Sequence, residues 1–94
     1  MNYTEMMNWL RIEFPQCAWL ESTVFGNRCI AAYIGTSRVL VRITKSGKFG
    51  VDLDKKGSPY SEACETIEQV RSAIIQCLKN ISIELVEDVQ MTLF

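Results

Sequence analysis

Residues 19–54 contain four successive segments in which apolar and polar residues alternate, separated by short turns that contain Gly, Asn or Ser. Alternation with a period of two places the apolar side chains on one face of a β-strand. Turns of two or three residues join neighbouring antiparallel strands. The stretch therefore predicts a four-stranded antiparallel meander whose strands lie side by side in sequence order.

The turn lengths predict the register, because a hairpin turn must place the apolar side chains of both strands on the same face. Gly26 and Asn27 predict a type II′ turn, and Thr36 with Ser37 predicts a second two-residue turn. A three-residue turn at 45–47 is favoured over a two-residue one, which would pair apolar with charged positions. The resulting pairs are Trp19 with Ile34, Phe25 with Arg28, Ile34 with Val39, Ala32 with Val41, Ile30 with Ile43, Ile43 with Phe49, Val41 with Val51, and Val39 with Leu53.

One face of this sheet is predicted to form the core, and the other face is mixed. Glu21 lies on the core face of the first strand, where an inward-pointing charge discourages edge-to-edge association. Leu20, Tyr33 and Leu40 lie among charged residues on the mixed face. The predicted core face carries Trp19, Thr23, Phe25, Ile30, Ala32, Ile34, Val39, Val41, Ile43, Phe49, Val51 and Leu53.

Two helices are expected to flank the meander. Asn2 and Glu5 form a capping box for a helix that ends at Phe14, before Pro15, and Thr66 begins a second helix that extends to about Lys79. The apolar stripes of these helices comprise Tyr3, Met6, Met7, Leu10 and Phe14 in the first, and Ile67, Val70, Ile74, Cys77 and Leu78 in the second. Residues 60–65 are expected to form an irregular turn.

Residues 81–94 permit two interpretations. Ile81, Leu85 and Val89 would continue the stripe of the second helix, whereas alternation and β-branched side chains after Asn80 favour a strand. We expect a strand or a tail. The predicted fold is a single α+β domain, residues 1–94: an N-terminal helix, a four-stranded antiparallel meander, a second helix, and a C-terminal strand or tail.

Composition narrows the function classes. The chain has 48% hydrophobic and 22% charged residues, which is typical of a globular domain rather than a disordered chain. It lacks an apolar run long enough to cross a membrane and a signal-peptide pattern at its start, so we expect a cytoplasmic protein without membrane association. Four cysteines without a C-x-x-C pair, and no histidine, predict free thiols and no metal or other cofactor.

Catalytic motifs are not recognised. The lack of histidine excludes Ser-His-Asp and Cys-His catalysis. Asp52 and Asp54 are expected to form cross-strand ion pairs with Arg42 and Arg38, respectively. The glycine pattern matches neither common phosphate-binding loop. We therefore expect no enzymatic activity.

The charge distribution suggests nucleic-acid binding as an alternative function. Residues 1–57 contain eight Lys and Arg against five Asp and Glu, whereas residues 58–94 contain two against six. The meander places four basic residues at one end of the sheet, with Tyr33 on the arginine face for base stacking. The pI of about 5.4 is much lower than such binders usually have. The candidate contacts are Arg28, Arg42, Lys45 and Lys48.

The order of helix, strands and helix is similar to that of double-stranded-RNA-binding domains. The chain departs from that family by a fourth strand before its second helix. The start of this helix, Thr66, Ile67, Glu68 and Gln69, is acidic where the family presents lysines to phosphate. The family's RNA contacts therefore transfer to no residue here.

A second resemblance concerns size and organisation. A short chain in which the strand residues 51–54 are followed by a helix beginning at 66–70 resembles small phage-encoded inhibitors such as anti-CRISPR proteins. The resemblance implies a protein-binding module that occludes a surface of another protein or of a protein–RNA complex. Aromatic and large apolar residues outside the predicted core are the candidate contacts: Trp9, Ile12, Leu20, Tyr33 and Leu40.

The sheet edges suggest self-association. The fourth predicted strand, residues 48–54, has acidic residues on one face only, so it is the less protected edge. Addition of a strand there, from residues 81–94 or from a second copy, would bury it. The pattern favours a homodimer, with a monomer whose tail pairs internally as the alternative.

Overall fold

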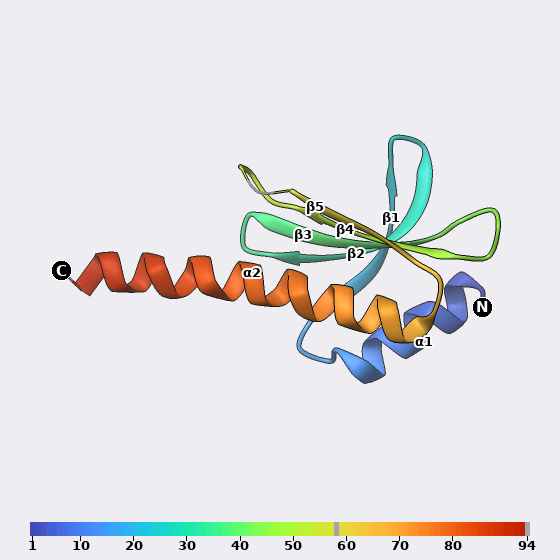
Figure 1. Cartoon of the computed structure of the whole chain (residues 1–94), viewed down its shortest axis with the longest axis horizontal. Coiled ribbons are helices and arrows are strands. Elements are labelled where there is room, and N and C mark those ends of the chain that lie inside the picture. The colour runs from blue at the N-terminus through green and yellow to red at the C-terminus, as the bar shows by residue number, and fades with distance from the viewer. Residues whose placement is uncertain (58, 94) are drawn as a thin grey trace.

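The computed structural model describes the backbone of residues 1–57 and 59–93 and the side chains of residues 1–57 and 59–81. Its strands form one antiparallel sheet in the order β1-β2-β3-β4-β5 (Figure 1). The α+β class and the antiparallel meander predicted from the sequence are confirmed. The elements are α1 (Tyr3–Glu13), β1 (Trp19–Val24), β2 (Asn27–Ile34), β3 (Ser37–Ile43), β4 (Phe49–Asp54), β5 (Tyr60–Cys64) and α2 (Ile67–Leu93).

The number of strands was predicted wrongly. Tyr60–Cys64, expected to be an irregular turn, forms the fifth strand and pairs with β4, with Leu53 opposite Tyr60 and Phe49 opposite Cys64. The segment is short and only Cys64 within it is buried, so its alternation is weak in the sequence. The edge of β4 is therefore covered within the same molecule by β5.

The C-terminal strand or tail was also predicted wrongly, because α2 continues to Leu93. The alternative helical interpretation is the correct one for the backbone of residues 81–93, while Phe94 lies outside the described residues. Ile81 is buried and extends the stripe formed by Val70, Ile74 and Cys77. Burial of a continuous helical stripe outweighs the weak strand preference of β-branched residues, which depends strongly on context.

Two hairpin registers differ from the prediction by two residues. Trp19 lies opposite Ala32 rather than Ile34, because Phe25 and Gly26 form the first turn. In the second hairpin, Ile34 lies opposite Ser37 rather than Val39. A shift of two residues leaves every side chain on its predicted face. The third hairpin is as predicted, with the pairs Ile43 and Phe49, Val41 and Val51, and Val39 and Leu53.

The conformation of the first turn explains why the register of the first hairpin differs from the prediction. Phe25 and Gly26 both have positive φ, 52° and 78°, as a type I′ turn requires. This turn matches the right-handed twist of the flanking strands. Phe25 is 97% exposed and Thr23 is also exposed, so their assignment to the core was wrong.

Both helices cover the same face of the sheet (Figure 1). The predicted capping boxes are present: Glu5 N–H donates to Asn2 Oδ1, and Gln69 N–H donates to Thr66 Oγ1. Trp19 Nε1 donates to the carbonyl oxygen of Phe14, the C-cap of α1, at 3.1 Å. The core joins Met6, Met7, Leu10, Phe14, Cys17, Trp19, Ile30, Ala32, Val39, Val41, Phe49, Val51, Leu53, Cys64, Val70, Ala73, Ile74, Cys77 and Ile81.

The four cysteines are free and buried, as expected for thiols that act as small apolar side chains. Burial, with a smaller contribution from the negative charge of Asp52, raises the pKa of the Cys77 thiol to about 11. An unfolded thiol loses its proton near pH 8.5. Between these values the folded state holds more protons than the unfolded state, so stability falls as pH rises.

We expect the free energy of unfolding of the wild-type protein to decrease between about pH 8.5 and pH 11. Replacing Cys77 by alanine should flatten this dependence by up to about 1.4 kcal/mol per pH unit. Urea denaturation at a series of pH values measures both slopes. Identical slopes would contradict the assignment to Cys77.

Candidate functional site

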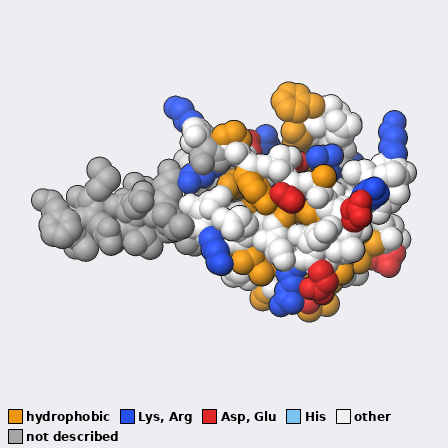
Figure 2. Space-filling model, in the orientation of Figure 1, with side chains coloured by type: hydrophobic (Ala, Val, Ile, Leu, Met, Phe, Trp, Pro, Cys, Tyr) orange, Lys and Arg blue, Asp and Glu red, His pale blue; other side chains and the backbone are white. Residues whose placement is uncertain are grey.

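No described helix covers the face of the sheet opposite α1 and α2, and this uncovered face is partly apolar. Leu20 of β1 lies opposite Ala31 of β2, which lies opposite Leu40 of β3. Tyr33 follows two residues after Ala31 and shares its face. Leu20 and Tyr33 are 44% and 54% exposed, whereas Leu40 is buried beside Ala31 and Cys29. On the side of the molecule that Figure 2 shows, apolar side chains are interspersed with charged ones.

The predicted protein contacts separate into two groups. Leu20, Tyr33 and Leu40 lie together on the uncovered face. Trp9 and Ile12 lie on α1, which packs on the other face. Trp9 is half-buried and packs edge-on against Phe14, with ring centroids 6.2 Å apart, whereas Ile12 is 76% exposed. One flat partner surface cannot contact both groups at once.

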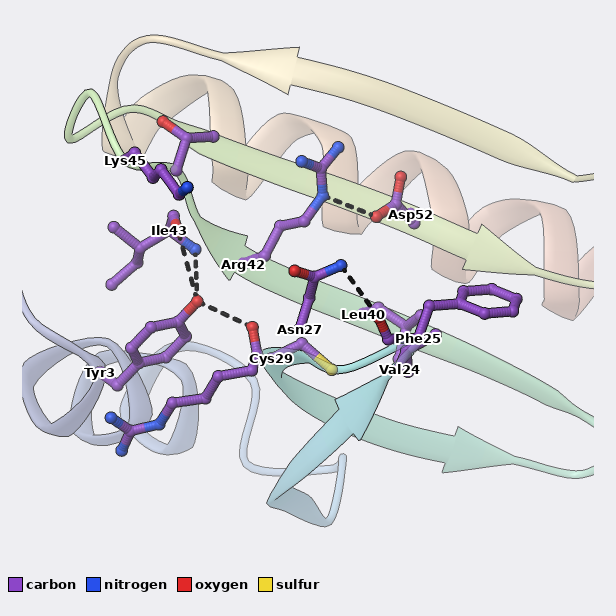
Figure 3. Close-up of a pocket in the computed structure, with 12 residues that line it drawn as sticks. Tyr3, Val24, Phe25, Asn27, Cys29, Leu40, Arg42, Ile43, Lys45 and Asp52 are labelled. Atoms are coloured by element: carbon purple, nitrogen blue, oxygen red, sulfur yellow. Dashed lines mark hydrogen bonds and ion pairs between the residues drawn. The ribbon is translucent and has the colours of Figure 1, made fainter.

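A groove of about 470 Å³ opens between the β1–β2 and β3–β4 hairpins. The β2–β3 ladder ends at the pair of Ile30 and Val41, although both strands continue beyond it. Beyond this pair the two hairpins diverge, as Figure 1 shows. Buried Cys29 and Leu40 line the groove, and Phe25 lies beside it (Figure 3).

Tyr3 of α1 holds the two strands where they separate. Continuing the β2–β3 register would place Arg28 opposite Ile43. Instead, the Tyr3 hydroxyl accepts a hydrogen bond from Ile43 N–H at 3.0 Å and donates to the Arg28 carbonyl oxygen at 2.9 Å (Figure 3). The guanidinium of Arg28 also lies over the Tyr3 ring, 4.6 Å from its centroid. The tyrosine therefore replaces a direct ladder bond and keeps the groove open.

Replacing Tyr3 by phenylalanine should destabilise the fold by about 1–3 kcal/mol, because two backbone groups lose their partner at a half-buried position. Urea denaturation measures the loss. Tyr33→Phe is the matched control, since Tyr33 is exposed on the uncovered face and should change stability by less than about 0.5 kcal/mol. Equal effects of the two substitutions would show that the Tyr3 hydroxyl does not support the strands.

The structure places the four predicted nucleic-acid contacts at one end of the sheet, but three of them are paired. Arg28 pairs with Glu21, Arg42 with Asp52 and Lys48 with Glu65, each with an N···O separation of no more than 3.2 Å. Lys45 lies in the β3–β4 turn and has no ion pair within the described part of the chain. Arg28, Arg42 and Lys45 line the groove, and Lys48 does not.

The side chain of Arg42 is held by contacts with Asp52 and Gly50. Its Nε donates to Asp52 Oδ2 at 3.1 Å, and its guanidinium lies above Gly50, where a Cβ atom would approach Cζ to 2.6 Å. Asp52 also accepts a hydrogen bond from Ser61 Oγ at 2.6 Å. The predicted pair of Arg38 and Asp54 is present too, at 2.7 Å. These cross-strand contacts confirm the ion-pair interpretation of the two aspartates.

Groups that could perform chemistry in the groove are limited. Burial raises the pKa of the Cys29 thiol, with opposing contributions from the charges of Arg38 and Asp52. The thiol is therefore mainly protonated near neutral pH and is a poor nucleophile. Among residues 1–57 and 59–81, no group of three or more Cys, Asp or Glu side chains is arranged to hold a metal ion.

No family model, no curated protein and no solved structure matches this chain. Within the described residues, no helix is both long and apolar enough to cross a membrane.

Two residues important for the groove were missed by sequence reasoning. Phe25 was assigned to the core, and Tyr3 was treated only as part of the α1 stripe. A clue to Phe25 was available: Gly26 can occupy the second position of a two-residue turn, as in Asn-Gly hairpins. No local signal indicates that the Tyr3 hydroxyl bridges β2 and β3, because the bridge joins residues 25 and 40 positions apart.

Proposed function

We propose that this chain is a non-enzymatic protein-binding module whose contact surface is the uncovered sheet face and the tip of the β1–β2 hairpin. The contact residues on this surface are Leu20, Tyr33 and the turn residue Phe25, beside the buried Leu40. Aromatic side chains are enriched among the residues that dominate binding energy at interfaces. Trp9 and Ile12 on α1 are not part of this surface.

The observation that carries the proposal is the exposure and the left-handed backbone conformation of Phe25. Its side chain is 97% exposed, and its backbone φ is 52°. A left-handed conformation costs roughly 1–2 kcal/mol for a residue other than glycine, and exposure of the ring to water gives no compensation. A partner that buries the ring would gain the free energy of removing its apolar surface from water. Phe25 therefore destabilises the free protein but would stabilise a complex.

Replacing Phe25 by asparagine should stabilise the free protein by about 1 kcal/mol, because asparagine tolerates the left-handed region and forms good type I′ turns with glycine. Urea denaturation measures the gain. Tyr33→Asn is the matched control: it also removes an exposed aromatic ring, but from a strand, and should not stabilise. A destabilised Phe25→Asn variant would contradict the strain argument.

The function itself is tested by affinity capture from bacterial lysate. A partner retained by the wild-type protein should be lost from Phe25→Asn although this variant folds at least as well. Tyr33→Ser should also reduce capture, whereas Ile12→Ser, on the helix-covered side, should not. Equal capture by all four proteins would refute the proposed surface, as would a partner lost only from Ile12→Ser or Trp9→Ala.

The mode of action we propose is occlusion of a partner's surface, as for the small phage-encoded inhibitors that the sequence resembles. A module without a catalytic site acts through the area that it covers. For the proposed class of target, a bacterial CRISPR–Cas complex, the test is interference against an invading plasmid. Expression of the wild-type protein should restore plasmid establishment, and expression of Phe25→Asn should not.

Nucleic-acid binding is supported less well than protein binding. Three of the four candidate cations, Arg28, Arg42 and Lys48, are already paired with carboxylates. The carboxylates of these pairs offset the charge of the three cations and so weaken their long-range attraction for a phosphate backbone. Lys45 alone offers an unpaired charge among the described side chains of this group.

A further inference from the structure

The groove between the two hairpins combines an apolar floor with basic groups at its rim. Cys29 and Leu40 are 4% and 7% exposed, and Val24 packs against them. A volume of about 470 Å³ lies within the range of sites that enclose a small ligand or a few side chains. An apolar side chain fits the floor of such a site.

The charged residues that line the groove indicate the polar part of its ligand. The lining contains three basic residues, Arg28, Arg42 and Lys45, and one acidic residue, Asp52. Both oxygens of Asp52 are engaged, by Arg42 Nε and by Ser61 Oγ. Glu21 is not part of the lining but pairs with Arg28, so Lys45 supplies the excess positive charge, which favours an anionic occupant.

Arg42 retains donors for such an anion. Within the described residues its hydrogen bond to Asp52 uses Nε, so its Nη groups keep their protons for an incoming oxygen. A carboxylate can accept two parallel hydrogen bonds from a guanidinium group, a geometry that adds specificity. Figure 3 shows Arg42 on its strand, with Lys45 nearer the turn.

We propose that the groove recognises an acidic, apolar segment of the partner protein. An Asp or Glu carboxylate of this segment contacts Arg42 and Lys45, and a neighbouring large apolar side chain packs on Cys29 and Leu40. The exposed ring of Phe25 packs against the same segment. This inference rests on the proposed protein-binding function and specifies the chemistry of the partner.

A peptide segment fits better than a nucleic acid. Binding of single strands relies on a basic track that follows the phosphates and on aromatic platforms for successive bases. Here three basic groups line one groove, and the buried residues of its floor are aliphatic or carry a thiol. A peptide that carries an apolar side chain next to a carboxylate matches both the apolar floor and the basic groups of the groove.

The test is selection of random peptides displayed on phage against the purified full chain. We expect enriched sequences in which Asp or Glu is adjacent to Leu, Phe or Trp. Affinity of one selected peptide, measured by fluorescence anisotropy, should fall about tenfold in Lys45→Glu, which corresponds to about 1.4 kcal/mol. Lys56→Glu is the matched control, because Lys56 is exposed in the β4–β5 connection at the other end of β4, and should leave affinity unchanged.

The binding position is checked by amide chemical shifts in the presence of the selected peptide. Shifts centred on Cys29, Leu40 and Thr44 support the inference, and shifts confined to Leu20 and Tyr33 overturn it. Selection of peptides without acidic residues, or equal affinity in Lys45→Glu and wild type, also overturns it. If a short single-stranded oligonucleotide binds the wild type but not Lys45→Glu, the inference is overturned in favour of phosphate recognition.

Failure of this inference is distinguishable from failure of the proposed function. A captured partner that is lost from Phe25→Asn and Tyr33→Ser but retained by Lys45→Glu would keep the protein-binding surface and reject the acidic segment. Lys45 lies in an exposed turn, so its substitution leaves the fold intact. The thermal transition of Lys45→Glu, expected to match that of the wild type, verifies this.

Discussion

Val41→Asp should abolish the cooperative unfolding transition of this protein. Val41 is 0% exposed and lies opposite Val51 and Ile30 in the middle of the helix-covered face. An aspartate there would place a carboxylate among apolar side chains without a partner, which is among the most destabilising single changes known. A domain of this size has a total stability of about 5–15 kcal/mol, so the variant should be largely unfolded.

Thermal denaturation followed by circular dichroism measures this effect. Tyr33→Asp is the matched control, because it introduces the same charge on the uncovered face, where Tyr33 is 54% exposed. Ile43→Asp should have an intermediate effect, because Ile43 is half-buried at the end of its strand. A melting curve of Val41→Asp identical to that of the wild type would show that residue 41 does not face the core.

Trp19→Ala should destabilise the fold by about 3–5 kcal/mol. Trp19 is 4% exposed and packs edge-on against Phe14, with ring centroids 6.4 Å apart. Its indole N–H also satisfies the carbonyl that ends α1. The substitution therefore leaves a large cavity between α1 and the sheet, while the Phe14 carbonyl oxygen keeps its second hydrogen bond, from Cys17 N–H at 3.2 Å.

Urea denaturation of two further variants separates these contributions. Trp19→Phe keeps most of the ring but removes the donor, and should cost about 0.5–1.5 kcal/mol, because Cys17 N–H still donates to the Phe14 carbonyl oxygen. Trp9→Ala removes a half-buried indole from the surface of the same aromatic group and should cost less than Trp19→Ala. Equal losses for Trp9→Ala and Trp19→Ala would contradict the central position of Trp19.

The third hairpin shows where sequence reasoning succeeds. Its three-residue turn contains Gly47 at a φ of 83°, and apolar residues occupy matching positions on both strands. Turn chemistry and alternation therefore agree. In the first hairpin they do not, because a phenylalanine occupies a left-handed position that favours Gly, Asn or Asp. The preference for glycine at the first turn position places that turn one residue later, as we did.

The C-terminal segment shows a different limit. Alternation in residues 81–85 is compatible with a strand, and the helical stripe through Ile81 is compatible with a helix. The choice depends on whether a surface exists to bury the stripe. Ile81 packs into the core formed by the sheet and α1, a surface that does not exist until the chain has folded.

The candidate site was only partly predictable. Alternation alone places Leu20, Tyr33 and Leu40 on one face, because period two holds whatever the register. It also predicts the cross-strand pairs of Arg38 with Asp54 and Arg42 with Asp52. Alternation cannot show that β2 and β3 separate beyond Ile30, since the separation depends on the Tyr3 hydroxyl, which comes from a distant helix.

The sequence by itself determined the α+β class, the capping boxes, the meander and the assignment of most strand residues to a face. These features depend on neighbours within one helical turn or one hairpin, where local preference and side-chain period act directly. The tertiary structure decided the fifth strand, the length of α2, the divergence of the two hairpins and the groove between them. Those features depend on which distant surfaces meet, and only packing of the complete core brings Tyr3, Arg28 and Ile43 together.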